Sequence, residues 1–160
     1  MISKRMFLTS AASAVIAAGA GFIGVRPAIA SQAKWNKGDG GYAADGADVV
    51  SYFSLDADAR GVPGTDSFVT EWNGARWRFS SADTLATFKT YPARYAPKYG
   101  GYCAWAVAQG YTAHGDINAW HIEDGKLYLN YNRRIRTRWR KDIPGFIAQA
   151  DANWPALLTT

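Results

Sequence analysis

The sequence predicts a single α+β domain built from two β-hairpins with packed short helices. Asn73-Gly74 and Asp124-Gly125 each separate two segments in which apolar and polar residues alternate. Asn-Gly and Asp-Gly in this setting are the strongest local signals of a hairpin. Each hairpin is followed by segments with helical spacing and capping residues. The resulting order of hairpin, helix, helix, hairpin, helix, helix is typical of the α+β class.

Residues 1–30 precede this domain and have the features of a signal peptide. Lys4 and Arg5 come before a short apolar segment, and the small-residue sequence AIA ends it. The apolar segment is too short for a convincing membrane span. The sequence SKRMFLTS resembles the twin-arginine export motif, with lysine in place of the first arginine. We therefore expect a periplasmic or secreted protein with no membrane span after cleavage.

The chain that remains after cleavage has the length of one domain. We expect 31–45 to be a flexible segment, and 46–155 to form the domain together with a C-terminal helical extension. The leader holds three basic residues and no acidic one, so 15 basic and 13 acidic residues remain. This near balance gives no support to nucleic-acid binding.

The first half of the domain contains a short β-rich segment at 49–53 and then the first hairpin. The two-residue turn pairs side chains across the core face, and it pairs Glu71 with Arg76 on the solvent face. The predicted core-face pairs are Trp72 with Ala75, Thr70 with Trp77, and Phe68 with Phe79.

A helix follows the first hairpin, with Ser80 as N-cap and Asp83 as the acid of a capping box. Leu85 and Phe88 give it a buried side, and Pro92 ends it. A second short helix is predicted at 100–110.

The second hairpin pairs Ile122 with Leu127 and Trp120 with Leu129 on one face, and His121 with Tyr128 on the other. A basic helix at 132–142 follows, capped by Asn132. Ile135 and Trp139 would form its buried seam, with the arginines in solvent. A last helix begins near Pro144 with Asp142 as cap. It turns apolar residues to the core: Phe146, Ile147, Ala150 and Trp154.

The segment from Trp77 to Tyr95 resembles the YHS domain, a small module found beside heavy-metal transporters and oxidoreductases. Phe88, Pro92 and Tyr95 fall on its aromatic and proline positions, whereas Ser80 and Thr84 stand where the family has cysteines. The longer sequence to Pro155 looks like an exported branch of that family. The resemblance implies a YHS-like domain of the cell envelope associated with copper handling, but the family's two thiol ligands are absent here.

A metal site would need other ligands, and three side chains can supply them: Cys103, His114 and His121. One cysteine and two histidines suit copper or zinc. Their spacing matches no known zinc signature. The loop with His114 connects the segment of Cys103 to the strand of His121, so the three side chains could meet at one end of the second hairpin.

Two other functions remain open. Tyr99, Tyr102 and Trp105 could line a pocket for a small ligand beside the glycines at 100–101, with Cys103 as a buried structural residue. Alternatively, Cys103 could act as a nucleophile in a thiol enzyme, although no catalytic set is recognisable.

The sequence thus favours an exported, non-enzymatic binding domain whose partner is a transition metal ion, with copper favoured by the resemblance and zinc as the alternative metal. A small molecule or a partner protein is the alternative ligand, and thiol catalysis comes third.

Overall fold

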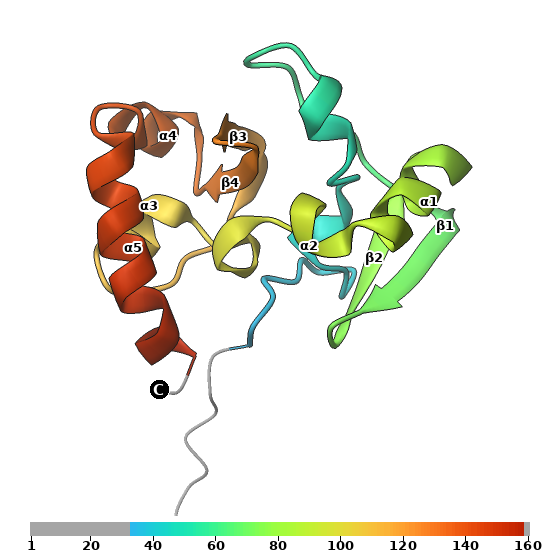
Figure 1. Ribbon diagram of the computed structural model, residues 1–160, viewed down its shortest axis with the longest axis horizontal. Coiled ribbons are helices and arrows are strands. Elements are labelled where there is room, and N and C mark those ends of the chain that lie inside the picture. Colours follow the sequence, from blue (N-terminus) through green and yellow to red (C-terminus); the bar gives the residue numbers. More distant parts are fainter. Residues whose placement is uncertain (1–32, 159–160) are drawn as a thin grey trace, which may run out of the picture.

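The computed structural model describes residues 33–158, which form two antiparallel hairpins with helices after each one (Figure 1). The first hairpin joins β1 (Thr65–Trp72) to β2 (Ala75–Phe79), and the second joins β3 (Asp116–Glu123) to β4 (Lys126–Asn130). The helices are α1 (Ala82–Thr90), α2 (Pro92–Tyr95), α3 (Ala104–Ala108), α4 (Arg133–Trp139) and α5 (Ile143–Leu157), with 3₁₀ turns η1 (Ala44–Gly46), η2 (Ser51–Ser54) and η3 (Lys98–Gly101). This order confirms the predicted α+β class.

The predicted signal peptide lies outside the described residues. Within 33–158, no helix has both the length and the apolar character needed to cross a membrane.

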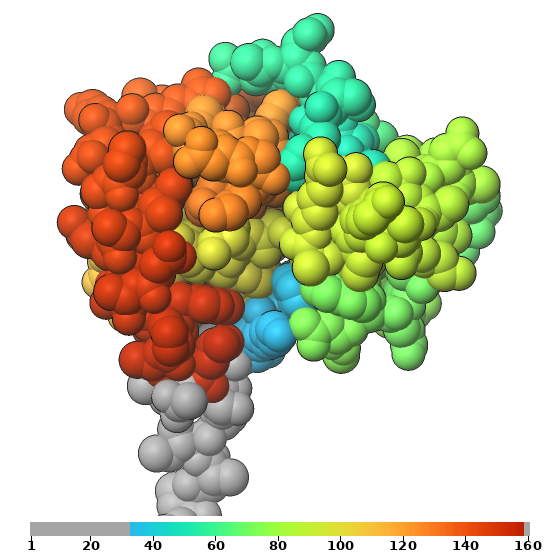
Figure 2. Space-filling view, in the orientation of Figure 1, coloured from blue at the N-terminus to red at the C-terminus, as the bar shows by residue number. Residues whose placement is uncertain are grey.

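Helix α5 and the first hairpin lie on opposite sides of the molecule, with the second hairpin between them (Figure 2).

The Asn73-Gly74 turn fixes the register of the first hairpin only near the turn. Trp72 opposes Ala75 and Thr70 opposes Trp77, as predicted. Farther away the register shifts, so that Phe79 opposes Thr65 and the predicted Phe68–Phe79 pair is wrong. Turn chemistry sets the nearest pairs, whereas extra residues accommodated in one strand change the pairing beyond them.

Asp48 is fully buried and ties the segment before η2 to the start of α1. One carboxylate oxygen accepts hydrogen bonds from the backbone amide and the hydroxyl of Ser80, at 2.9 and 2.6 Å. The N-cap of α1 is Ser81, whose hydroxyl accepts from the Thr84 amide at 3.2 Å. The predicted cap is therefore wrong by one residue. Both serines suit a cap, and only the distant Asp48 distinguishes them.

The segment 49–53 contains the 3₁₀ turn η2 instead of the predicted β-structure. The backbone carbonyl of Asp48 accepts from the Ser51 amide and hydroxyl, at 3.2 and 2.7 Å, which closes a helical turn. Val49 and Tyr52, three residues apart, both enter the core. The Tyr52 hydroxyl donates to the carbonyl of Ile117 at 2.8 Å.

Strand β4 is buried on both faces and separates two clusters of apolar side chains. Leu127 and Leu129 lie in the first cluster with the aromatic side chains of the first hairpin and α1. Tyr128 lies in the second cluster, against Trp139 of α4 with ring centroids 5.4 Å apart. Successive residues of a strand point to opposite faces, so this one strand contributes to both cores.

The N-terminal segment, expected to be flexible, packs against the first core although it has little regular structure. The ring of Trp35 lies edge-on to Trp77, with centroids 4.9 Å apart. The chain passes so close to Gly100 that a Cβ there would lie 1.8 Å from the carbonyl oxygen of Lys34. Gly100 also has a φ of 61°, which favours glycine.

The same backbone geometry shortens the helix that was expected at 100–110. Tyr99 and Gly100 both have positive φ values, which an α-helix does not contain, and they belong to η3. Helix α3 therefore covers only Ala104–Ala108, with Cys103 at its N-cap position.

The two C-terminal helices begin at the predicted caps. Asn132 accepts from the Ile135 amide at 2.9 Å, and Asp142 accepts from the Gly145 amide at 3.1 Å. The predicted apolar side of α5 packs on the second core through Phe146, Ile147, Ala150 and Trp154.

Arg136 of α4 departs from the expectation that all arginines of this helix lie in solvent. Its side chain is buried, and it donates to the carbonyl of Trp120 at 3.2 Å and to the carboxylate of Asp58. Helical periodicity alone would place this guanidinium in solvent. Two acceptors that are distant in the sequence, the Trp120 carbonyl and the Asp58 carboxylate, instead bind some of its N–H groups inside the protein.

Truncating Leu127 tests the role of β4 between the two cores. We expect Leu127→Ala to lower the free energy of unfolding by about 2–5 kcal/mol, because it leaves a cavity at a fully buried site. Leu55→Ala, at a partly buried site on the same core, should lower it by less than about 1.5 kcal/mol. Urea denaturation measures both changes, and equal losses would contradict the assigned role.

Candidate functional site

The structure places the three predicted metal ligands at three different hollows of the molecule. Cys103 lines one hollow, His121 lines a second with Trp120 and Arg140, and His114 lines a third with Asp45. Among residues 33–158, no group of three or more His, Cys, Asp and Glu side chains is arranged to hold a metal ion.

Each histidine has hydrogen-bond partners of its own. His121 Nε2 lies 3.0 Å from a carboxylate oxygen of Glu123, two residues along the same strand. His114 Nδ1 lies 3.2 Å from the side-chain amide nitrogen of Asn36, and its Nε2 lies 3.9 Å from a carboxylate oxygen of Asp45. These contacts account for both imidazoles without Cys103.

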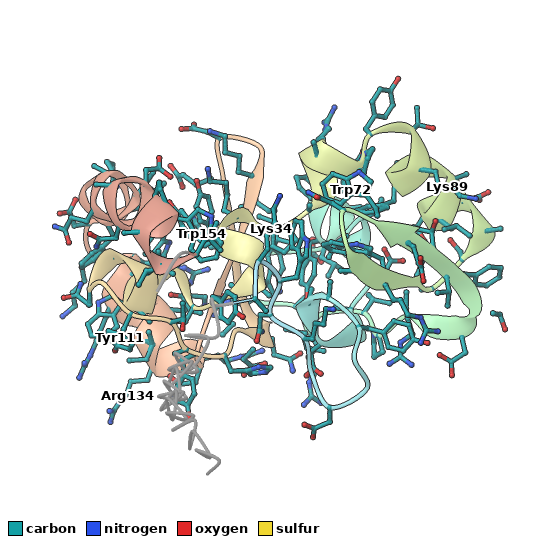
Figure 3. All side chains as sticks on the ribbon, turned by 90° about the horizontal axis from the view of Figure 1, so that it is seen from below. Lys34, Trp72, Lys89, Tyr111, Arg134 and Trp154 are labelled. Atoms are coloured by element: carbon teal, nitrogen blue, oxygen red, sulfur yellow. The ribbon has the colours of Figure 1, made fainter. Side chains whose placement is uncertain are left out.

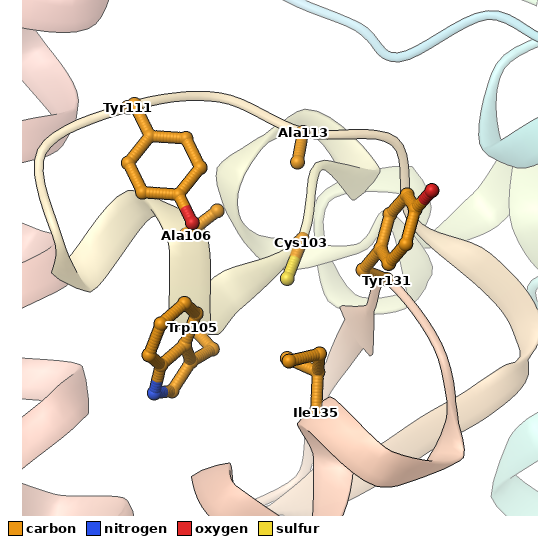
Figure 4. Close-up of a pocket in the computed structure, with 7 residues that line it drawn as sticks. All are labelled: Cys103, Trp105, Ala106, Tyr111, Ala113, Tyr131 and Ile135. Carbon is orange, nitrogen blue, oxygen red and sulfur yellow. The ribbon is translucent and has the colours of Figure 1, made fainter.

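The hollow beside Cys103 is an apolar pocket of about 220 Å³ (Figure 4). It is formed where α3 and the loop after it face the start of α4. The sulfur of Cys103 and the side chains of Ala113 and Ile135 turn toward the space between three aromatic rings (Figure 4). The complete lining is Cys103, Trp105, Ala106, Tyr111, Ala113, Tyr131 and Ile135.

Two large aromatic residues of this pocket are unusually exposed. Tyr111 has 48% and Tyr131 has 54% of its surface accessible, although both are among the pocket-lining residues. Exposed aromatic rings that adjoin an apolar hollow are typical of sites that bind ligands or partners.

Cys103 has a fixed position at the floor of the pocket. Its backbone amide donates to the carbonyl of Ala113 at 2.9 Å, and its backbone forms a parallel bridge with Leu129 of β4. Its sulfur lies 3.9 Å from Oδ1 of the fully buried Asn130. The same oxygen also accepts from the Trp105 amide, at 3.4 Å.

Burial raises the pKa of the Cys103 thiol, because the thiolate loses its hydration in this apolar setting. Backbone hydrogen bonds from Ala106, Tyr131 and Trp105 lower the pKa, but their effect is smaller than that of burial. The thiol is therefore the favoured form at neutral pH. A thiol is both a weaker nucleophile and a weaker metal ligand than a thiolate.

The three aromatic residues predicted to bind a ligand are not all at one site. Trp105 lines the pocket, whereas Tyr99 and Tyr102 pack in the second core against Trp154. The Tyr99 hydroxyl donates to the carboxylate of Asp151 at 2.9 Å, and burial is the main cause of its raised pKa. Gly100 beside them permits the close approach of the protein's own N-terminal segment at Lys34.

The remaining residues of the pocket are absent from the sequence-based prediction. The methyl side chains of Ala106 and Ala113 have no functional group that would mark a site in the sequence, and Ile135 was expected to contact only the core. The available signal was two tyrosines in connecting segments, with Tyr131 directly after β4 and Tyr111 three positions after the end of α3.

Comparison with protein-family models, with curated proteins and with solved structures finds no match to this chain. The resemblance to the YHS domain stays a prediction from the sequence.

The state of the thiol can be tested by alkylation. At about pH 7.5 we expect iodoacetamide to modify Cys103 in the folded protein at least about tenfold more slowly than in guanidinium chloride, because burial favours the protonated thiol. The rate in the folded protein should increase as the pH rises through the raised pKa. Mass spectrometry follows the reaction, and equal rates in the two states would contradict the assignment.

Proposed function

We propose that this chain is a binding domain that takes a small, largely apolar molecule in the pocket beside Cys103. The observation that carries the proposal is the pocket itself, an apolar hollow with exposed tyrosines and lining residues from separate segments. Its volume of about 220 Å³ lies below the usual range for drug-sized ligands. The ligand would therefore be smaller than a typical drug.

The surroundings of Cys103 favour binding over thiol catalysis. None of the residues that line the pocket is a histidine, an aspartate or a glutamate, so the lining offers no general base for the thiol. The raised pKa also leaves little thiolate at neutral pH. In this proposal Cys103 is part of the apolar floor of the pocket.

We also propose that the protein is located in the periplasm or outside the cell, because its sequence predicts a signal peptide. An unpaired thiol in an oxidising compartment needs protection from oxidants. Cys103 is 1% exposed, which supports such protection.

Copper binding remains a second proposal. The sulfur of Cys103 lines a pocket that is large enough for a ligand. The chain's other sulfur atoms belong to its two methionines, which lie in the predicted leader. His114 and His121 line other hollows, so a copper ion at the sulfur would take its further ligands from outside this set. Loss of the thiol proton on binding would make the affinity increase with pH.

A small fluorinated probe can test the apolar pocket. We expect 4-fluorotoluene to bind with a Kd of about 0.1–1 mM, the range that its few atoms can support. Ala113→Phe should abolish binding, because the side chain of Ala113 points into the pocket (Figure 4). The measurement is ¹⁹F NMR of the probe during titration with the protein.

Ala152→Phe is the matched control, because it adds the same ring at an exposed site on α5. Both variants must keep the melting temperature of the parent within a few degrees, which circular dichroism checks. Absence of binding to the parent protein, or equal loss in both variants, would refute the apolar pocket. Tight Cu(I) binding that is lost in Cys103→Ala, without probe binding, would favour the second proposal.

A further inference from the structure

The arginines of α4 fall into two sets with different partners. Arg133, Arg136 and Arg140 turn to Asp58, which they contact through its backbone carbonyl or its carboxylate. The charge of Arg136, followed by that of Arg140, holds the pKa of Asp58 below its usual range. Spacings of three and four residues place these arginines along one side of the helix.

Arg134 and Arg138 form the second set, and they lie on another side of α4. Both are exposed. Within residues 33–158, neither guanidinium lies within ion-pair distance of a carboxylate. The nearest acid in sequence, Asp142, serves as the N-cap of α5. Two cationic groups one helical turn apart are thus left without an anionic partner in the described part of the chain.

Arg138 of this second set lies beside the pocket. The guanidinium carbon of Arg138 is 5.9 Å from the ring centroid of Trp105, which lines the pocket. Ile135, which also lines it, is next to Arg134 in sequence and one helical turn before Arg138. In the view of Figure 3, Arg134 and Tyr111 lie on the same side of the molecule, away from the first hairpin.

The pocket and the arginines together select a chemical class of ligand. The pocket lining carries no charged side chain, so its interior suits an apolar body. A guanidinium binds a carboxylate through paired hydrogen bonds while its plane packs on an aromatic ring. An aromatic or short aliphatic acid could therefore place its apolar part in the pocket and its carboxylate near Arg138.

We infer that the pocket binds a small organic carboxylate, with Arg138 and Arg134 as the groups that attract its negative charge. This inference rests on the proposed binding of an apolar molecule and adds the charge of that molecule. The ligand's apolar body supplies contact area, and its carboxylate provides the preference over neutral analogues.

Three probes of similar size test the inference: 4-fluorobenzoate, its neutral analogue 4-fluorobenzamide, and 4-fluorotoluene. We expect the benzoate to bind about three- to tenfold more tightly than the benzamide, as for a partly exposed ion pair. Raising the salt concentration should weaken binding of the benzoate and leave binding of 4-fluorotoluene unchanged. Titration by ¹⁹F NMR measures all three affinities.

Substitutions separate the local charge from the net charge of the protein. Arg138→Gln should reduce the preference for the benzoate to less than about twofold, whereas Arg138→Lys should keep part of it. Arg94→Gln is the matched control, since the Arg94 guanidinium lies 5.5 Å from the Tyr95 ring centroid on α2, which contributes no residue to the pocket. It should leave the preference unchanged.

The outcomes distinguish this inference from the function on which it rests. If 4-fluorotoluene binds but the benzoate binds no more tightly than the benzamide, the inference fails and the apolar pocket stands. Equal effects of Arg138→Gln and Arg94→Gln would also overturn the inference, because they would show a general charge effect. If none of the three probes binds to the parent protein, both proposals fail.

Discussion

The burial of β4 on both faces is the constraint on which the arrangement of the molecule depends. Leu127 and Leu129 belong to one core and Tyr128 to the other, so a shift of register by one residue would exchange the two sets. The Asp124-Gly125 turn prevents that shift, because a two-residue turn fixes the pairs beside it. A short local signal thereby determines how the two cores meet.

The pocket depends on the same strand. Cys103 forms a backbone bridge with Leu129, and the amide oxygen of Asn130 accepts from the first turn of α3. The chain then leaves β4 through Tyr131, which lines the pocket, and enters α4 at Asn132. The floor and one wall of the pocket are therefore connected to a strand that cannot move without disturbing both cores.

The sequence predicts those features that depend on neighbouring residues, and it fails where distant residues decide. The two turns and the caps at Asn132 and Asp142 are local, and the structure confirms them. The cap at Ser81 is missed because the distant Asp48 binds Ser80. The pocket is missed for the same reason. Its lining comes from segments that only the fold brings together, and the alanines among its residues carry no chemical signal.

Helix α4 shows why a charge pattern needs the fold before it can be interpreted. The sequence alone does not distinguish its arginines, yet Asp58 forms ion pairs with Arg136 and Arg140 on one side of the helix, whereas Arg138 lies near Trp105 of the pocket. Had Asp58 faced Arg138 instead, it would partly neutralise the positive charge near Trp105, and the proposed preference for a carboxylate would be weaker. The position of one acid in the loop before β1 thus affects the charge beside the pocket. For this reason the proposed function rests on the pocket together with its arginines, and not on the cysteine alone.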